Sequence, residues 1–278
     1  MRDRKRKTNR SRVVDMIGRV HADLFSQEKF LLNGVDLRMR LTRSKDAFSL
    51  MAVEDGGAYP QYRVQIVHAS LFVRKCKLNP AVVLGHARAL EKATAKYPIQ
   101  RVVTRVISIP AGNLNVVQDN LFLDQLPKQL FIGLVDSTAF NGHYAGSPFE
   151  FKHYHLNFLA LYQEGKQVPV KALKPNFVNG EYMRSYMSLF SGTNTSWKDV
   201  GNTISPSDYD KGYTLYGFDL TPSLVDGNQA ELIRAGSLRL EMSFALGLQA
   251  PVHVILYAQF DGLIEIDKSR QVLLNFPA

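Results

Sequence analysis

Two histidines, His153 and His155, have a spacing that could bind a metal ion. Alternate residues of a β-strand point to the same side, so a strand over residues 149–162 would present both imidazoles together. Jelly-roll enzymes use such pairs, but a metal site also needs a further ligand, for example a carboxylate, at a matching position. The sequence spacing identifies none, and the alternative is an aromatic strand that is packed or faces solvent. We therefore predict no metal site and no cofactor.

The single cysteine, Cys76, is the other candidate for chemistry. Basic residues on both sides would favour a reactive thiolate, but no catalytic partner follows from the sequence, and we interpret it as a structural thiol. One cysteine excludes an internal disulfide framework. The chain also lacks a nucleophile elbow, a phosphate-binding glycine loop and a zinc-protease helix motif. We predict a protein without catalytic residues and not an enzyme.

The first twelve residues form a basic arm with a net charge of +6, out of +9 for the whole chain. Such an arm can bind phosphate groups without sequence preference or act as a nuclear-import signal. The alternative is a mobile segment that only meets solvent. The candidate nucleic-acid contacts are its seven cations, Arg2, Arg4, Lys5, Arg6, Lys7, Arg10 and Arg12.

Aromatic side chains gather between residues 140 and 162. They could stack on bases or sugars, which would suit a lectin-like module. Aromatic residues also dominate cores and interfaces, so we expect them to form core and an intersubunit surface. The residues concerned are Phe140, Tyr144, Phe149, Phe151, Tyr154, Phe158 and Tyr162.

The elements that must position these residues are strands, and the clearest lie near the C-terminus. From Gly236 to Phe244 apolar and polar residues alternate strictly, which predicts a half-buried strand. Residues 252–260 are apolar on both faces, which predicts a strand covered on both sides or packed on a neighbouring domain. Further short strands are expected at residues 100–110, 129–135, 149–162 and 213–220, with a helix within 178–190. Many short strands separated by turn signals indicate a β-sandwich or jelly roll.

The first eighty residues repeat part of this pattern. Leu37–Leu41 follows Gly34 much as Leu238–Met242 follows Gly236, and apolar stretches flank both copies in the same order. Strands are therefore expected at residues 13–25, 35–41 and 62–77. Between the copies, Asn79-Pro80 begins and Tyr97-Pro98 ends a predicted helix over residues 80–96. We place the connection between two β-domains there.

Composition fits a folded protein of this kind. The 278 residues are 45% hydrophobic, enough for one large or two ordinary domains. No apolar run approaches the eighteen or so residues of a membrane-spanning helix, and none follows the basic arm as in a signal peptide.

Several long motifs, in order, resemble hexon-like major capsid proteins, in particular those of Maverick/Polinton elements and adintoviruses and related uncharacterised proteins of animal genomes. The resemblance runs from about residue 12 to 276. The motifs are Arg12-Val-Val-Asp-Met-Ile-Gly-Arg19, Leu31-Leu-Asn-Gly-Val-Asp-Leu37, Leu41-Thr-Arg-Ser-Lys-Asp-Ala-Phe48, Ala93-Thr-Ala-Lys-Tyr-Pro98, Tyr209-Asp-Lys-Gly-Tyr-Thr-Leu-Tyr216 and Ile264-Glu-Ile-Asp267.

The resemblance implies an all-β double jelly roll whose first roll is incomplete here. It divides the chain into a basic arm (1–12), the closing strands of jelly roll 1 (13–78), a connecting helix (79–97) and jelly roll 2 (98–278). Family members lack catalytic residues and trimerise into pseudo-hexagonal capsomers, which contact neighbouring capsomers and minor capsid proteins. The implied locations are the virion and the cytoplasm and nucleus of a host cell. The alternatives are a carbohydrate- or ligand-binding jelly roll, a capsid remnant retained by a host for another role, and a metal-dependent enzyme.

Overall fold

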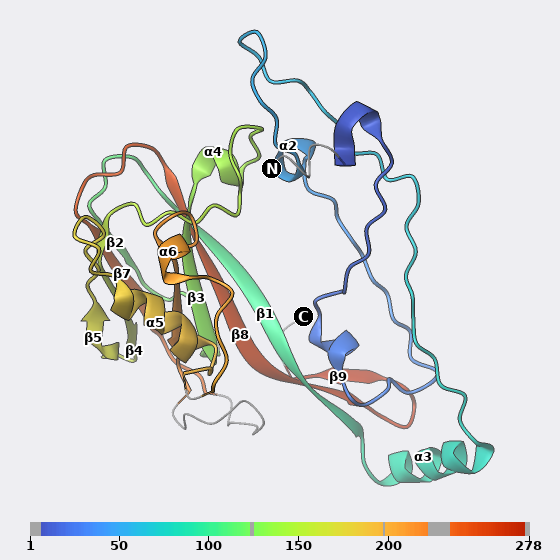
Figure 1. Ribbon diagram of the computed structural model, residues 1–278. Coiled ribbons are helices and arrows are strands. Elements are labelled where there is room, and N and C mark those ends of the chain that lie inside the picture. The colour runs from blue at the N-terminus through green and yellow to red at the C-terminus, as the bar shows by residue number, and fades with distance from the viewer. Residues whose placement is uncertain (1–6, 123–124, 197, 222–233, 276–278) are drawn as a thin grey trace.

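The computed structural model describes residues 7–122, 125–196, 198–221 and 234–275 (Figure 1). Residues 95–274 form two antiparallel sheets, and helices are short and few, so the predicted all-β class is confirmed. No described helix has the length and apolarity that crossing a membrane requires.

The order of the strands is that of a jelly roll. Pairing joins the first strand to the eighth, the second to the seventh, the third to the sixth and the fourth to the fifth. One sheet has the order β1-β8-β3-β6, with β9 beside β8: β1 Ala95–Ile109, β8 Val252–Ile266, β3 Gln129–Asp136, β6 Leu215–Asp219 and β9 Val272–Leu274. The other has the order β2-β7-β4-β5: β2 Asn115–Gln118, β7 Leu238–Phe244, β4 Leu156–Gln163 and β5 Lys166–Leu173.

The core lies between these sheets and follows the alternation of the sequence. In β7 the four apolar residues of one face, Leu238, Leu240, Met242 and Phe244, are at most 3% exposed, as predicted. Alternate residues of β8 face them from the other sheet. The fourth and fifth strands are joined by Glu164 and Gly165, which both have positive φ, as a two-residue type I′ hairpin requires.

Helix α5 (Met183–Gly192) covers the outer face of β6, which explains the glycine there. Gly192 and Gly217 meet so closely that a Cβ on Gly192 would lie 2.7 Å from the Gly217 Cα. Ser188 accepts a hydrogen bond from the Gly217 N–H at 3.1 Å. Among the described residues of this part, the other helices are single turns, α4 (Ser137–Phe140) and α6 (Pro206–Tyr209).

The predicted aromatic strand over 149–162 is wrong in its first half. Its strand, β4, begins only at Leu156, because Tyr154 and His155 both have positive φ (45° and 52°) and turn the chain. His153 and His155 therefore do not share a strand face. The helix predicted within residues 178–190 corresponds to α5, which begins at Met183 and ends at Gly192.

The connecting helix, α3 (Pro80–Lys92), begins where predicted. The Asn79 side chain accepts a hydrogen bond from the Ala81 N–H at 2.9 Å, and Pro80 occupies the first helical position. The helix ends four residues earlier than predicted, because Ala95–Pro98 already pair with β8. Apart from Leu90 its residues are exposed, and Figure 1 shows it projecting from the sheets.

Residues 7–79 contain short helical turns but no strand: η1 (Asn9–Ser11), η2 (Asp23–Ser26) and α2 (Asp46–Ser49). The strands predicted at 13–25, 35–41 and 62–77 are not formed, because a strand needs a hydrogen-bonded neighbour and the described residues supply none. Of the repeat, only the second copy forms strands: residues 215–217 lie in β6, Leu238–Met242 in β7 and residues 252–260 in β8, while residues 228–233 lie outside the described part. The division into two rolls at residues 13–78 and 98–278 stays a prediction.

Candidate assembly interface at the free edge of the jelly roll

Strand β1 forms a free edge of the larger sheet. It pairs with β8 over all fifteen residues, without a register shift. Strand β3 pairs only with residues 252–259 of β8, so residues 95–101 and 260–266 run on past it as a ribbon (Figure 1). The backbone hydrogen-bonding groups of the even-numbered residues of β1 point away from β8, toward the open side. The hydrogen bonds that side chains make with the backbone of Lys96, Pro98 and Gln100 show this.

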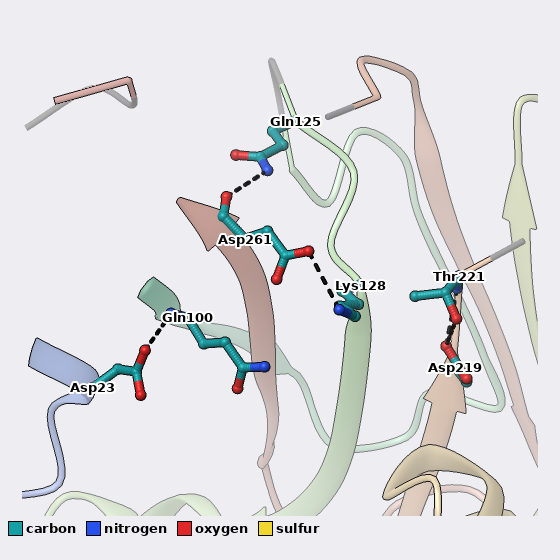
Figure 2. Close-up of polar contacts among 7 residues, drawn as sticks. All are labelled: Asp23, Gln100, Gln125, Lys128, Asp219, Thr221 and Asp261. Atoms are coloured by element: carbon teal, nitrogen blue, oxygen red, sulfur yellow. Dashed lines mark hydrogen bonds and ion pairs between the residues drawn. The ribbon is translucent and has the colours of Figure 1, made fainter. Parts of the chain in front are cut away.

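Side chains of the preceding segment cap the first part of this edge. An Asp23 Oδ2 accepts a hydrogen bond from the Gln100 backbone N–H at 2.7 Å (Figure 2). Gln27 Nε2 donates to the Pro98 carbonyl at 2.7 Å, and Lys29 Nζ donates to the Lys96 carbonyl at 3.4 Å. Capping an edge strand with side chains satisfies its backbone without adding another strand.

The other strand of the ribbon, β8, is also bonded to the rest of the protein, at the position opposite Gln100. Asp261 lies opposite Gln100 in the register of β8. Its carboxylate binds Lys128 Nζ at 3.3 Å, and its carbonyl accepts from Gln125 Nε2 at 3.1 Å (Figure 2). Lys128 is only 10% exposed, so this ion pair is shielded from water more than surface pairs are. Both sides of the ribbon are thus held where it leaves the sandwich.

Beyond Gln100 the edge is open. In the part of the chain that the structure describes, no hydrogen bond reaches the edge-facing backbone groups of Val102, Thr104, Val106 and Ser108. The outer face beside them is apolar and partly exposed: Val102 is 41%, Val106 43% and Tyr257 41% exposed. An open edge next to an apolar face is the kind of surface that accepts a further strand or a packed neighbour.

The inward side of β1 carries two arginines that close the sandwich at this edge. Arg101 lies over the Phe260 ring with its guanidinium carbon 4.8 Å from the centroid, and Arg105 lies over Phe122 at 5.3 Å. Arg105 also donates to the Leu121 carbonyl at 2.6 Å. Cations stacked on rings cover the core while their charges stay bonded.

The same N-terminal segment makes a second contact, at the aromatic loop that starts at residue 140. Phe48 packs edge-on against Phe149 with centroids 5.8 Å apart, and Tyr59 packs against His143 at 5.0 Å. Ala52 N–H donates to the Tyr144 carbonyl at 3.0 Å, and Tyr144 Oη donates to the Tyr62 carbonyl at 3.0 Å. Part of the predicted aromatic surface is thus an interface, although within one chain.

Asp46 braces this contact. Its carboxylate accepts a hydrogen bond from the Val64 backbone N–H at 3.0 Å and is paired with Arg43. These partners hold the pKa of Asp46 below its usual value, the Val64 bond being the larger cause. These interactions therefore join Arg43, Asp46 and Val64 of the segment near the place where it contacts the aromatic loop.

Between its two contacts the segment leaves many apolar side chains in water. None of the residues described between 7 and 79 is buried. The most exposed include those that the sequence assigns to strands: Val13, Met16, Ile17, Leu41, Ile66, Val67 and Phe72, all at least 64% exposed. Exposed apolar side chains in such number favour contact with another protein surface.

Most of the predicted nucleic-acid contacts lie outside the described residues. Arg2, Arg4, Lys5 and Arg6 lie outside the described residues, while Lys7, Arg10 and Arg12 are exposed. Cys76 is an exposed free thiol. Among the described residues, no group of three or more histidine, cysteine, aspartate or glutamate side chains is arranged to hold a metal.

Comparisons with known proteins give distant matches. No protein-family model matches the chain. The uncharacterised protein F54H12.2 of Caenorhabditis elegans is 26% identical over 265 residues, which cover 92% of this chain and 62% of that protein. The chain thus spans less than two thirds of that relative's length.

Solved structures similar to this chain include viral capsid proteins. The VP54 protein of PBCV-1, fitted into a reconstruction of the virophage Sputnik, matches with a TM-score of 0.38 and 11% identity, covering 66% of this chain and 52% of VP54. The mavirus major capsid protein matches with a TM-score of 0.34 and 10% identity, covering 66% of this chain and 42% of that one.

Proposed function

We propose that this chain is a structural protein of a viral capsid, in which copies of it associate through the free edge of β1 and the N-terminal segment. The jelly-roll strand order of residues 95–274 suits such a building block. The capsid-protein motifs of the sequence agree with that role. Since a jelly roll also serves binding proteins and enzymes, the fold alone does not carry the proposal.

The main support for this proposal is that the sequence of residues 13–78 favours buried strands, whereas the structure leaves this segment outside the sheets and unburied. This segment has strand-forming, apolar sequence, yet its described residues form no strand and none is buried. It lies beside an edge strand whose backbone is open from Val102 to Ser108. Exposed strand-forming sequence and an open edge both gain free energy by pairing with another chain.

The finer assignment follows the sequence resemblance. We propose a trimeric, pseudo-hexagonal capsomer of a Maverick/Polinton-like or adintovirus capsid, in contact with neighbouring capsomers and minor capsid proteins. The basic arm would supply contact with nucleic acid. The protein would occur in the virion and, during assembly, in the cytoplasm and nucleus of the host cell.

Light scattering on the purified chain tests the association, with a variant that blocks the edge. Thr104→Pro removes an N–H that faces the open side, so it leaves the pairing with β8 intact. Thr104→Val keeps the N–H and serves as the matched control. We expect the wild type and Thr104→Val to form oligomers at concentrations where Thr104→Pro does not. Oligomers of equal size in all three would contradict a role for this edge.

A further inference from the structure

A tight turn at residues 153–156 leads into β4, and it contains an imidazole as a hydrogen-bond acceptor. The His155 backbone N–H donates to His153 Nδ1 at 3.0 Å, and the Leu156 N–H donates to the His153 carbonyl at 2.9 Å. Tyr154 and His155 both have positive φ, which costs free energy in residues other than glycine. The hydrogen bonds of His153 therefore hold a strained turn closed.

This turn aligns two strands of the smaller sheet. Leu156, its last residue, is 1% exposed and pairs with Phe244 of β7. The Ala245 N–H donates to the His155 carbonyl at 2.9 Å, directly after β7 ends. Opening the turn would release this bond and the first residue of β4 from the core.

The donor in the turn determines the protonation state of His153. A backbone N–H can only donate, so Nδ1 must present its lone pair, and the proton of the neutral ring lies on Nε2. A second proton can be added only at Nδ1. It would turn the acceptor into a donor that points at another donor, and the bond that closes the turn would be lost.

The groups packed around His153 act on its charge in opposite directions. Its ring stacks on Phe177 with centroids 4.2 Å apart, and the His155 ring meets it edge-on at 4.9 Å. Burial first, and then His155, lower the pKa of His153, while the carboxylate of Asp210, which follows α6, opposes them.

The other neighbours are aromatic rings or lie at the surface. Tyr182 and Tyr209 continue the stack from Phe177, and burial raises the pKa of Tyr209 further above its usual value. Glu150 and Lys152, earlier in the same loop, form an exposed ion pair at 3.3 Å. Among the groups that shift the pKa of His153, the Asp210 carboxylate is therefore the one that favours a positive charge on the imidazole.

We propose that the His153–Leu156 turn is an acid-sensitive latch: protonation of His153 opens the turn and loosens β4 from β7. A histidine whose pKa is lower in the folded than in the unfolded chain binds fewer protons when folded. Its contribution to stability is complete above the unfolded value of about 6.5 and is lost as the pH falls below that value. The latch is therefore closed at neutral pH and weakened in mildly acidic solution.

Hydrogen exchange of the full chain, compared between variants at equal pH, tests this. In His153→Asn the side-chain oxygen can accept the same N–H in an Asx-turn but does not titrate. We expect wild type and His153→Asn to protect residues 156–160 equally at pH 7.5. At pH 5.5 the wild type should exchange faster, by up to about tenfold per pH unit below the titration midpoint. His86→Asn, on the exposed helix α3, should behave as the wild type.

Equal pH dependence in the wild type and His153→Asn would overturn the latch. If His153→Asn does not fold, NMR of the wild type decides the question. The Leu156 amide must then lose protection at the pH at which the His153 ring titrates. Loss of protection at a midpoint unrelated to that ring would contradict the proposal.

Discussion

An Asp23 carboxylate oxygen lies 2.7 Å from the backbone nitrogen of Gln100, which places a side chain of the N-terminal segment on the open edge of β1. Asp23→Ala removes this acceptor, whereas Asp23→Asn keeps a neutral oxygen there. A typical hydrogen bond contributes about 0.5–1.5 kcal/mol, so exchange of the Gln100 amide should rise by about two- to tenfold in Asp23→Ala. Asp23→Asn should give a smaller rise. Hydrogen exchange measured by NMR checks this, and an unchanged Gln100 amide would show that the contact is absent in solution.

Because α5 lies so close to β6, adding one methyl group at Gly217 should clearly lower the stability of the fold. A Cβ on Gly217 would lie 2.8 Å from the Ser188 carbonyl oxygen and 3.2 Å from the Gly192 Cα, and both are backbone atoms. Gly217→Ala should lower the free energy of unfolding by about 1–3 kcal/mol, as overpacking does. Gly18→Ala, with no atom within 4 Å of the added Cβ, is the matched control and should change it little. Urea unfolding of both variants measures the difference, and equal midpoints would refute this packing.

Because β7 contributes to the core, removing one of its large side chains should lower the free energy of unfolding. Phe244 is 3% exposed and belongs to the core between the sheets. Phe244→Ala should cost about 3–5 kcal/mol of stability, because a cavity is left where the ring was. Leu246→Ala, at a position 60% exposed two residues later, should stay within about 0.5 kcal/mol of the wild type. Similar losses in the two variants would contradict the burial of Phe244 in the core between the sheets.

Strict alternation made the C-terminal strands predictable. In β7, and across most of β8, each residue's face follows from its parity, and both strands have partners within the described chain. The open edge of β1 could not be predicted, because edge or centre depends on strand order, which alternation does not specify. The nearest signal was the polar pair Asp23 and Gln27, four residues apart, which meet the edge together.

The wrong predictions have a common physical cause. Residues 149–155 contain the aromatic, β-favouring side chains of a strand, but two successive positive φ angles turn the backbone instead. Residues 35–41 alternate like β7, yet they remain without a strand because propensity does not replace a hydrogen-bonded neighbour. Sequence pattern therefore indicated which segments favour strands, and tertiary context decided which of them form.

The basic arm predicts a salt-dependent affinity for DNA. Its seven cations can displace counterions from phosphates, and the remaining chain is close to charge balance. Deleting residues 1–12 should flatten the slope of log affinity against log salt concentration, measured by fluorescence anisotropy with labelled DNA. Replacing the seven cations with glutamine, at unchanged length, separates charge from chain length. An unchanged slope in both variants would place nucleic-acid contact elsewhere.

Electron microscopy of the protein expressed from its own locus, together with whatever coding sequence adjoins these 278 residues, tests the capsid role most directly. We expect threefold-symmetric particles, in which the N-terminal segment and the open part of β1 are covered by protein. Thr104→Pro in the same background should reduce their number. A monodisperse monomer that forms no particles at any concentration, with that segment still exposed, would contradict the account.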